Sequence, residues 1–207
     1  VPKGYRKLGE ARESLMVQAP GVDGKIAAVP YALLADTGLT YERLRWRRRK
    51  GLDQRALEIL LKPIQELGPR PEKWWMERHI VSRIALRKSN ADLAYRLASE
   101  HGQKAGGFSF AQAEWLSGWI ALRHVKNPNQ ALYHFGLLYK NVRYPVSLAR
   151  AAYWAGRANT ALGKHNDAAS WYKAAARYPA TYYGQLASQA IVDSGSWLMP
   201  KEPTPTA

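Results

Sequence analysis

The chain has 207 residues, 46% of them hydrophobic, which is enough for one or two compact units, and it has no cysteine for disulfide or thiolate chemistry. It carries 31 lysine and arginine residues against 16 aspartate and glutamate residues, and this net charge of +15 attracts polyanions: nucleic acid, anionic lipid or anionic cell-wall polymer. The alternative is a basic surface without a specific partner. No stretch of the sequence approaches the roughly 18 apolar residues of a transmembrane segment, so we expect no such segment.

The N-terminal elements are predicted to be short and helical. Apolar residues at three-to-four spacing predict a helix from Gly4 to Gln18. Two short apolar pieces follow at 25–29 and 31–35, separated by Pro30. We assign residues 1–38 to this N-terminal helix and the short helical segments, which pack on the rest of the chain.

The helix predicted at 39–50 carries the densest positive charge of the chain. Its six cations lie within eight positions and are Arg43, Arg45, Arg47, Arg48, Arg49 and Lys50. At 100° per residue they cannot share one face of a helix. The sequence leaves two interpretations open. The helix forms an anion-binding ridge, or it is a solvated face whose arginines stack on Trp46 and pair with Glu42 or Asp53.

The remainder of the chain is predicted to consist of helices joined by short turns. Glycine and proline mark the breaks, most clearly in the Gly68–Pro71 cluster. Apolar spacing of three to four persists throughout, and no strand-like alternation competes with it. Helices are expected to start at Asp53 as a cap, at Glu72, at Asn90 or Ala91, at Phe108, near Ala131, near Arg150, at Asn166 or Asp167, and at Thr181.

The stretch 150–179 is the clearest helical hairpin. Gly163 is expected to end its first helix, because glycine adopts the left-handed conformation at low cost. Four residues occupy positions expected of a tetratricopeptide unit, namely Gly156, Ala168, Tyr172 and Ala175. Other positions of the hairpin depart from that consensus. One such hairpin cannot bury its own apolar face, so it requires neighbours.

A repeat of about the same length runs through the chain. The second helix of each predicted hairpin has a small residue near its start: Ala56, Ala94, Ala131 and Ala168. Subtracting these residue numbers gives spacings of 38, 37 and 37 residues. Gly118 and Gly156 are likewise 38 apart. We predict an all-α fold in which 39–195 form a right-handed superhelix or solenoid of about four antiparallel, tetratricopeptide-like helix pairs. Residues 196–207 have the composition of a linker or tail.

Motifs for catalysis or metal binding are not found. The five histidines are scattered, without an HExxH pair, and neither a phosphate-binding loop nor a GxSxG elbow is present, so we assign no metal or cofactor. Glu114 is an acid inside an otherwise apolar helix, and it is either a catalytic acid or the partner of an arginine on the adjacent helix. The eight tryptophans are either sugar-stacking platforms or core residues between helices.

Several sequence runs resemble the helical domain of the soluble lytic murein transglycosylases. The resemblance extends from about Leu39 to Ala187, and its closing YYGQLA phrase is particularly typical. The runs that carry it are LTYERLRWRRRKGLDQRALEILL, PEKWWMERHIVSRIALRKSNADLAYRLASEHG, AEWLSGWIALR, SLARAAYWAGRA and ASWYKAAARYPATYYGQLA.

This resemblance implies a periplasmic bacterial protein whose family cleaves the MurNAc–GlcNAc β-1,4 bond of peptidoglycan. The family leaves a 1,6-anhydro end, uses no cofactor, and carries its catalytic glutamate in a separate lysozyme-like domain. No stretch of this chain resembles that domain, so no catalytic residue is assigned. The resemblance implies instead a non-catalytic scaffold whose basic wall holds glycan strands or peptide stems near an active site.

The residues predicted to line this wall are Arg43, Arg47, Lys50, Arg78 and Arg87. Peptidoglycan is the expected partner. The alternative is a tetratricopeptide-like adapter that binds another protein of the bacterial envelope. No nucleic acid is expected, since the chain has a basic charge but no recognition motif.

Overall fold

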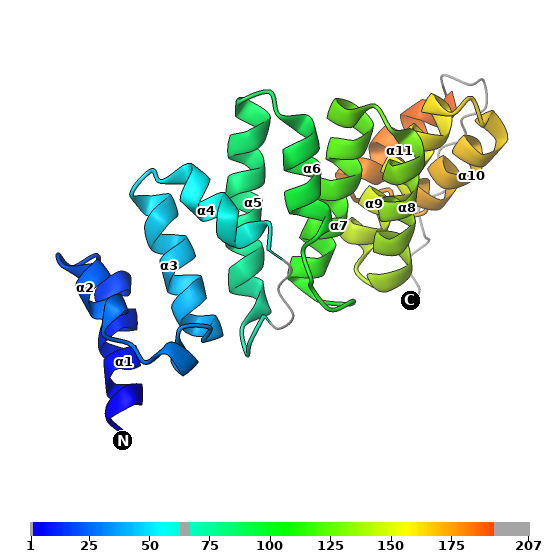
Figure 1. Cartoon of the computed structure of the whole chain (residues 1–207). Coiled ribbons are helices and arrows are strands. Elements are labelled where there is room, and N and C mark those ends of the chain that lie inside the picture. Colours follow the sequence, from blue (N-terminus) through cyan, green and yellow to red (C-terminus); the bar gives the residue numbers. More distant parts are fainter. Residues whose placement is uncertain (1, 63–66, 193–207) are drawn as a thin grey trace, which may run out of the picture. The chain divides into compact units, whose positions relative to one another are not determined.

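The computed structural model describes residues 2–62 and 67–192 (Figure 1). Within these residues the secondary structure is helical and contains no β-strand, which confirms the predicted all-α class. The chain divides into two compact units, one ending at Gln103 and the other starting at Lys104. The predicted superhelical, tetratricopeptide-like arrangement and the predicted boundary at residue 38 stay predictions. The predicted tail at 196–207 lies outside the described residues.

The N-terminal unit contains six α-helices in its described part. Helix α1 contacts α2 and α3, α3 contacts α4 and α5, and α5 contacts α6. The pair α5 and α6, joined by a short turn, runs in opposite directions (Figure 1). A short 3-10 turn, η1, covers Tyr31–Leu33. The helices are α1 (Lys3–Met16), α2 (Val22–Ala27), α3 (Thr37–Arg49), α4 (Asp53–Leu60), α5 (Pro71–Arg87) and α6 (Ala91–Ser99).

The C-terminal unit contains five α-helices in its described part, each in contact with the next. One π-helical turn, η2 (Ala121–Val125), interrupts the series after the first of them. The helices are α7 (Phe108–Ile120), α8 (Pro128–Asn141), α9 (Pro145–Ala161), α10 (His165–Ala176) and α11 (Tyr182–Val192).

Capping side chains explain where several helices begin. Asp36 accepts a hydrogen bond from the Leu39 amide at 2.8 Å, which starts α3 two residues before the predicted start. Asn90 caps α6 in the same way, and the helix starts at Ala91, one of the two predicted positions. Asn127 was predicted to lie in a turn and is also the cap of α8, so that helix begins earlier than expected.

Three further predicted helix starts differ from the structure. Asp53 lies inside the first turn of α4 and does not cap it. The helix predicted near Arg150 starts at Pro145, because proline is well suited to a first turn, where its missing amide is not needed. The second helix of that hairpin starts at His165, without a side-chain cap, rather than at Asn166 or Asp167.

The helix predicted to run from Phe108 to Val125 is also not continuous. Regular α-helix stops at Ile120, and a π-turn covers the last five residues. Lys126 then has a left-handed conformation with φ of 61°, and the Asn127 amide bonds to the carbonyl of Ala121 at 2.8 Å. This arrangement closes the turn and positions Asn127 to cap α8.

The hairpins of the C-terminal unit pack through glycine. A Cβ atom added to Gly118 would lie 2.6 Å from the ring of Phe135 on α8, and one added to Gly156 would lie 2.6 Å from the ring of Tyr172 on α10. The two glycines are 38 residues apart and the two aromatic residues 37 apart. The sequence repeat therefore corresponds to a repeated contact, in which an aromatic ring lies against a glycine on the preceding long helix.

Candidate anion-binding site

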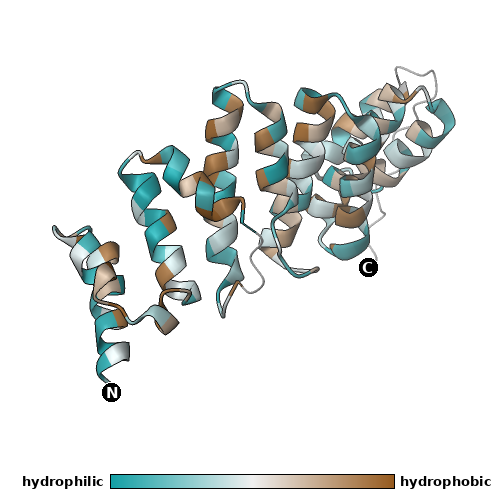
Figure 2. Ribbon diagram, viewed as in Figure 1, coloured by the Kyte–Doolittle hydropathy of each residue, from teal (hydrophilic) through white to brown (hydrophobic). Residues whose placement is uncertain are grey.

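The basic helix α3 distributes its charge among several neighbours. Figure 2 shows it as largely hydrophilic, and its buried residues are Leu39, Glu42 and Leu44. Arg45 lies 4.0 Å from Glu42, which is one of the two predicted partners. The other predicted partner, Asp53, bonds instead to Lys88 at 2.8 Å.

Arg48 forms the most buried ion pair of α3. Its Nη2 donates to Glu77 on α5 at 3.0 Å, and its Nε bonds to the second oxygen of the same carboxylate. The side chain of Glu77 is 4% exposed and that of Arg48 is 19% exposed. The hydrogen bond to Glu77 raises the pKa of Arg48, so the guanidinium remains charged. This pair joins α3 to α5 and is structural.

A second group of arginines lines a cavity of about 210 Å³ formed by residues of α1 to α4. We call it the arginine cavity. Its lining residues are Leu15, Asp23, Ile26, Ala27, Arg43, Trp46, Arg47 and Arg55.

The charge of the arginine cavity is unbalanced: its described lining holds three guanidinium groups and one carboxylate, that of Asp23. Arg47 donates to the carbonyl of Arg55 at 2.6 Å and lies 3.6 Å from Glu58, outside the lining. Burial lowers the pKa of Arg47, and repulsion by Arg43 lowers it further. An anion in this cavity would relieve that repulsion, and arginine is well suited to bind carboxylates with two parallel hydrogen bonds.

The arginine cavity also contains polar groups that lack a balancing partner in the described part of the chain. The side chains of Arg43 and Arg55 form neither a hydrogen bond nor an ion pair there. The indole Nε1 of Trp46 is buried without an acceptor among the same residues. Two such cations beside an unsatisfied donor make this a site that favours an acceptor with negative charge.

The structure brings together two of the five predicted wall residues, Arg43 and Arg47. Lys50 is exposed at the C-terminal cap of α3, and Arg87 is exposed near the end of α5; neither lines the arginine cavity. Sequence reasoning missed Arg55, because its proximity to the other two depends on how α4 folds back on α3.

Arg78 differs from the other predicted wall residues, because it is only 4% exposed. Its Nη2 donates to the carbonyl of Leu60 at 2.8 Å, and its Nη1 donates to that of Leu97 at 3.3 Å. Burial lowers its pKa. This placement makes Arg78 an interior residue that joins α4, α5 and α6, so we leave it out of the proposed binding surface.

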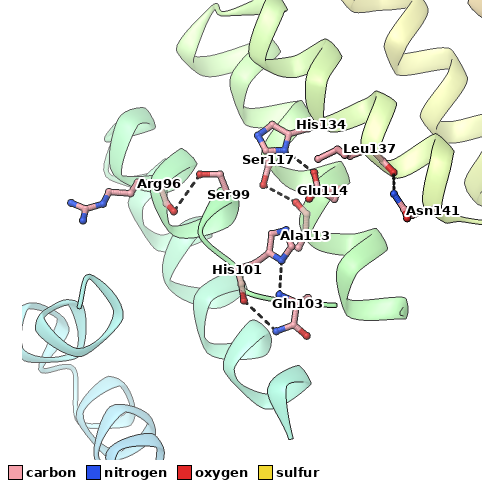
Figure 3. Close-up of polar contacts among 10 residues, drawn as sticks. All are labelled: Arg96, Ser99, His101, Gln103, Ala113, Glu114, Ser117, His134, Leu137 and Asn141. Atoms are coloured by element: carbon pink, nitrogen blue, oxygen red, sulfur yellow. Dashed lines mark hydrogen bonds and ion pairs between the residues drawn. The ribbon is translucent and has the colours of Figure 1, made fainter. Parts of the chain in front are cut away.

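In the C-terminal unit, Glu114 bonds to a histidine on the adjacent helix. Its Oε2 lies 2.7 Å from Nδ1 of His134, and both side chains are buried (Figure 3). The contact connects α7 to α8. An adjacent helix therefore supplies a partner for Glu114, and the partner that the structure shows is a histidine.

The tryptophans are used differently in the two units. Trp74 and Trp75 in the N-terminal unit are 2% and 1% exposed, as expected of core residues. In the C-terminal unit, Trp115 is half-buried and stacks on Trp119 with ring centres 6.2 Å apart. The guanidinium of Arg150 lies 5.1 Å from the centre of the Trp115 ring, a cation–π contact, and burial lowers its pKa.

Over residues 2–62 and 67–192, no group of three or more histidine, cysteine, aspartate or glutamate side chains is arranged to hold a metal ion. No helix within these same ranges is both long and apolar enough to cross a membrane.

Comparisons of the chain with protein families, with curated proteins and with solved structures find no match. The relationship to the soluble lytic murein transglycosylases therefore rests on the sequence runs quoted above and stays a prediction.

Proposed function

We propose that this chain is the non-catalytic helical scaffold of a periplasmic peptidoglycan lytic transglycosylase. In this proposal it positions peptidoglycan, and a catalytic domain outside this chain cleaves the MurNAc–GlcNAc β-1,4 bond to give a 1,6-anhydro product. The sequence resemblance over about 39–187 and the all-α fold support the class of protein. The observation that supports binding most directly is the arginine cavity, where three guanidinium groups face one carboxylate among the described lining residues.

The chemistry of peptidoglycan matches this site. Its peptide stems carry carboxylates, and a carboxylate can accept two hydrogen bonds from one guanidinium. Arg43 and Arg55 have guanidinium groups without an ion pair in the described part of the chain, so they can bind an anion without breaking an existing bridge. The net charge of +15 adds a long-range attraction that speeds the encounter and weakens with salt.

The test is retention of the purified chain on isolated sacculi over a series of salt concentrations. We expect retention that declines as salt rises. The double variant Arg43→Gln with Arg55→Gln should bind about ten-fold more weakly or worse, since one charge-assisted hydrogen bond contributes about 1.5–3 kcal/mol. The matched control, Arg83→Gln with Arg96→Gln, removes the same charge from exposed positions on α5 and α6.

Absence of salt-sensitive retention would reject the proposal. Equal losses in the two double variants would mean that net charge alone governs retention and that the arginine cavity is not the site. The purified chain is also expected to release no anhydro-muropeptides from sacculi, and their release would show that this chain is itself catalytic.

A protein-binding adapter of the bacterial envelope is the second candidate function. Two exposed apolar or aromatic side chains at the start of α9 favour it, Tyr144 at 79% and Val146 at 63% exposure. A stoichiometric complex with one envelope protein that is lost in Tyr144→Ser, together with no retention on sacculi, would support the adapter over the scaffold.

A further inference from the structure

The C-terminal unit contains a second and larger cavity, of about 470 Å³, between α9, α10 and α11. This volume lies in the range of about 300–1,000 Å³ that is common for sites that bind small molecules. We call it the tyrosine pocket. The polar residues that line it are Tyr153, Arg157, Thr160, His165, Tyr172 and Gln189.

The repeated glycine contact described above helps to shape this pocket. Gly156 allows the ring of Tyr172 to lie directly against α9, and the Tyr172 hydroxyl is then 3.2 Å from that of Thr160. The ring centre of Tyr153 lies 5.8 Å from that of Tyr172. Burial raises the pKa of Tyr172, so at neutral pH its hydroxyl keeps its proton and can act as a donor.

Arg157 provides the positive charge of the tyrosine pocket. Its Nη1 donates to the hydroxyl of Tyr153 at 3.1 Å, and its guanidinium carbon lies 5.9 Å from the centre of the same ring. Among the described residues, no aspartate or glutamate lines the pocket and none forms an ion pair with Arg157. Tyr153 thus holds the guanidinium in place without neutralising it, which leaves donors for an anion.

The rest of the described pocket wall is apolar. Ala168 and Ala169 come from α10, and Leu186, Ala190 and Ile191 come from α11. An apolar wall favours an apolar group of a ligand over a charged one, because a charge placed there would lose its hydration without gaining a partner. A ligand that suits both walls has a carboxylate at one end and apolar side chains next to it.

We propose that the tyrosine pocket binds the free carboxylate end of a short peptide with apolar side chains, with Arg157 holding the carboxylate. The stems of peptidoglycan are peptides that carry carboxylates and would be suitable ligands. Naming the stems as the ligand rests on the proposed function. It adds a second binding site for these stems, in the C-terminal unit and separate from the arginine cavity.

The test uses the full chain labelled with ¹⁵N and the dipeptide alanyl-alanine as the probe, in its L and D forms. At least one form should give saturable shifts in the amide signals of the pocket, such as those of Ala168 and Ala190. The matching C-terminal amide lacks the carboxylate charge and should bind about ten-fold more weakly or worse, because hydrogen bonds to a charged group are the stronger ones. This comparison uses the unaltered protein, so no loss of folding can produce it.

A pair of variants adds a second readout. Arg157→Gln should weaken binding of the dipeptide about ten-fold or more, whereas Arg143→Gln, at an exposed position before α9, should leave it unchanged. Absence of saturable shifts, equal binding of acid and amide, or equal effects of the two variants would each overturn the inference.

The two proposals can fail separately. Salt-sensitive retention on sacculi without binding of either dipeptide would reject the tyrosine pocket and leave the scaffold function standing. Binding of a dipeptide without retention on sacculi would reject the scaffold function and leave the pocket as a peptide site.

Discussion

The two units of this chain have interiors of different chemistry. The N-terminal unit buries charged side chains, among them Glu42, Glu77 and Arg78, each at most 6% exposed. The C-terminal unit buries a run of alanines on α9 together with Gly118 and Gly156. Directional bonds such as those of Arg48 and Arg78 join helices of the first unit, whereas the second combines one such contact, between Glu114 and His134, with close approach of helix backbones. The two units should therefore respond to different kinds of substitution.

The largest effect is expected where a buried charge loses its partner. Arg48→Met should lower the free energy of unfolding by about 3–5 kcal/mol, because it leaves the carboxylate of Glu77 buried without its guanidinium partner. Urea unfolding followed by circular dichroism measures the loss. The neighbouring Arg49 is exposed, so Arg49→Met should stay within about 0.5 kcal/mol of the wild type.

A second substitution sharpens this experiment. Replacing both partners, with Arg48→Met and Glu77→Met, removes the uncompensated charge and should recover much of the lost stability. If Arg48→Met and Arg49→Met unfolded at the same urea concentration, the buried Arg48–Glu77 pair would not stabilise the N-terminal unit, and the prediction would be wrong.

A smaller effect is expected from an added methyl group in the C-terminal unit. In Gly156→Ala the new Cβ would lie 2.6 Å from the ring of Tyr172, and overpacking of this kind costs about 1–3 kcal/mol. A Cβ atom added to Gly136 on α8 would meet no described atom within 4 Å, so Gly136→Ala should be neutral or stabilising by up to about 1 kcal/mol. Thermal unfolding of both variants measures the difference, and equal stabilities would contradict the close packing.

The smallest effect concerns His79 on α5, which stacks on Trp75 with ring centres 5.4 Å apart. Burial, and then the charge of Arg83, lowers the pKa of His79 below its ordinary value of 6.5. As the pH falls below 6.5, the unfolded chain takes up this proton more readily than the folded chain, so folding loses stability.

Unfolding of the wild type and of His79→Gln, measured between about pH 7.5 and 5.5, isolates this contribution. The wild type should lose stability relative to the variant as the pH falls, by less than about 1 kcal/mol, since His79 is only partly buried. A difference between the two proteins that does not change with pH would show that this histidine does not titrate differently on folding.

Much of the helical architecture was predictable from local signals. The start of α6 was predicted at Asn90 or Ala91, and the helix begins at Ala91 with Asn90 as its cap. The 38-residue spacing of Gly118 and Gly156 corresponds to a repeated packing contact. The helix boundaries that were predicted wrongly lie where several neighbouring residues could begin the helix with similar local energy. His165 starts α10 without a side-chain cap, although Asn166 and Asp167 are better caps, so capping preference alone did not identify the helix start.

The candidate site was less predictable than the fold. Arg43, Arg47 and Arg78 are all basic residues on helices, yet two line a cavity and the third is buried between carbonyl groups. Composition does not distinguish these cases, since the outcome depends on which face of each helix meets a neighbour. The tyrosine pocket was not predicted either, because it brings together residues from three helices.

The hydrogen bonds of Arg78 have a consequence for how the N-terminal unit can change in evolution. One guanidinium binds carbonyl groups in the last turns of both α4 and α6, so the ends of these two helices are fixed at a common point. Inserting one residue into either helix would shift its final carbonyl by about 1.5 Å along the axis and rotate it away. The lengths of α4 and α6 are therefore coupled, and insertions should be tolerated in the connecting loops but not within either helix.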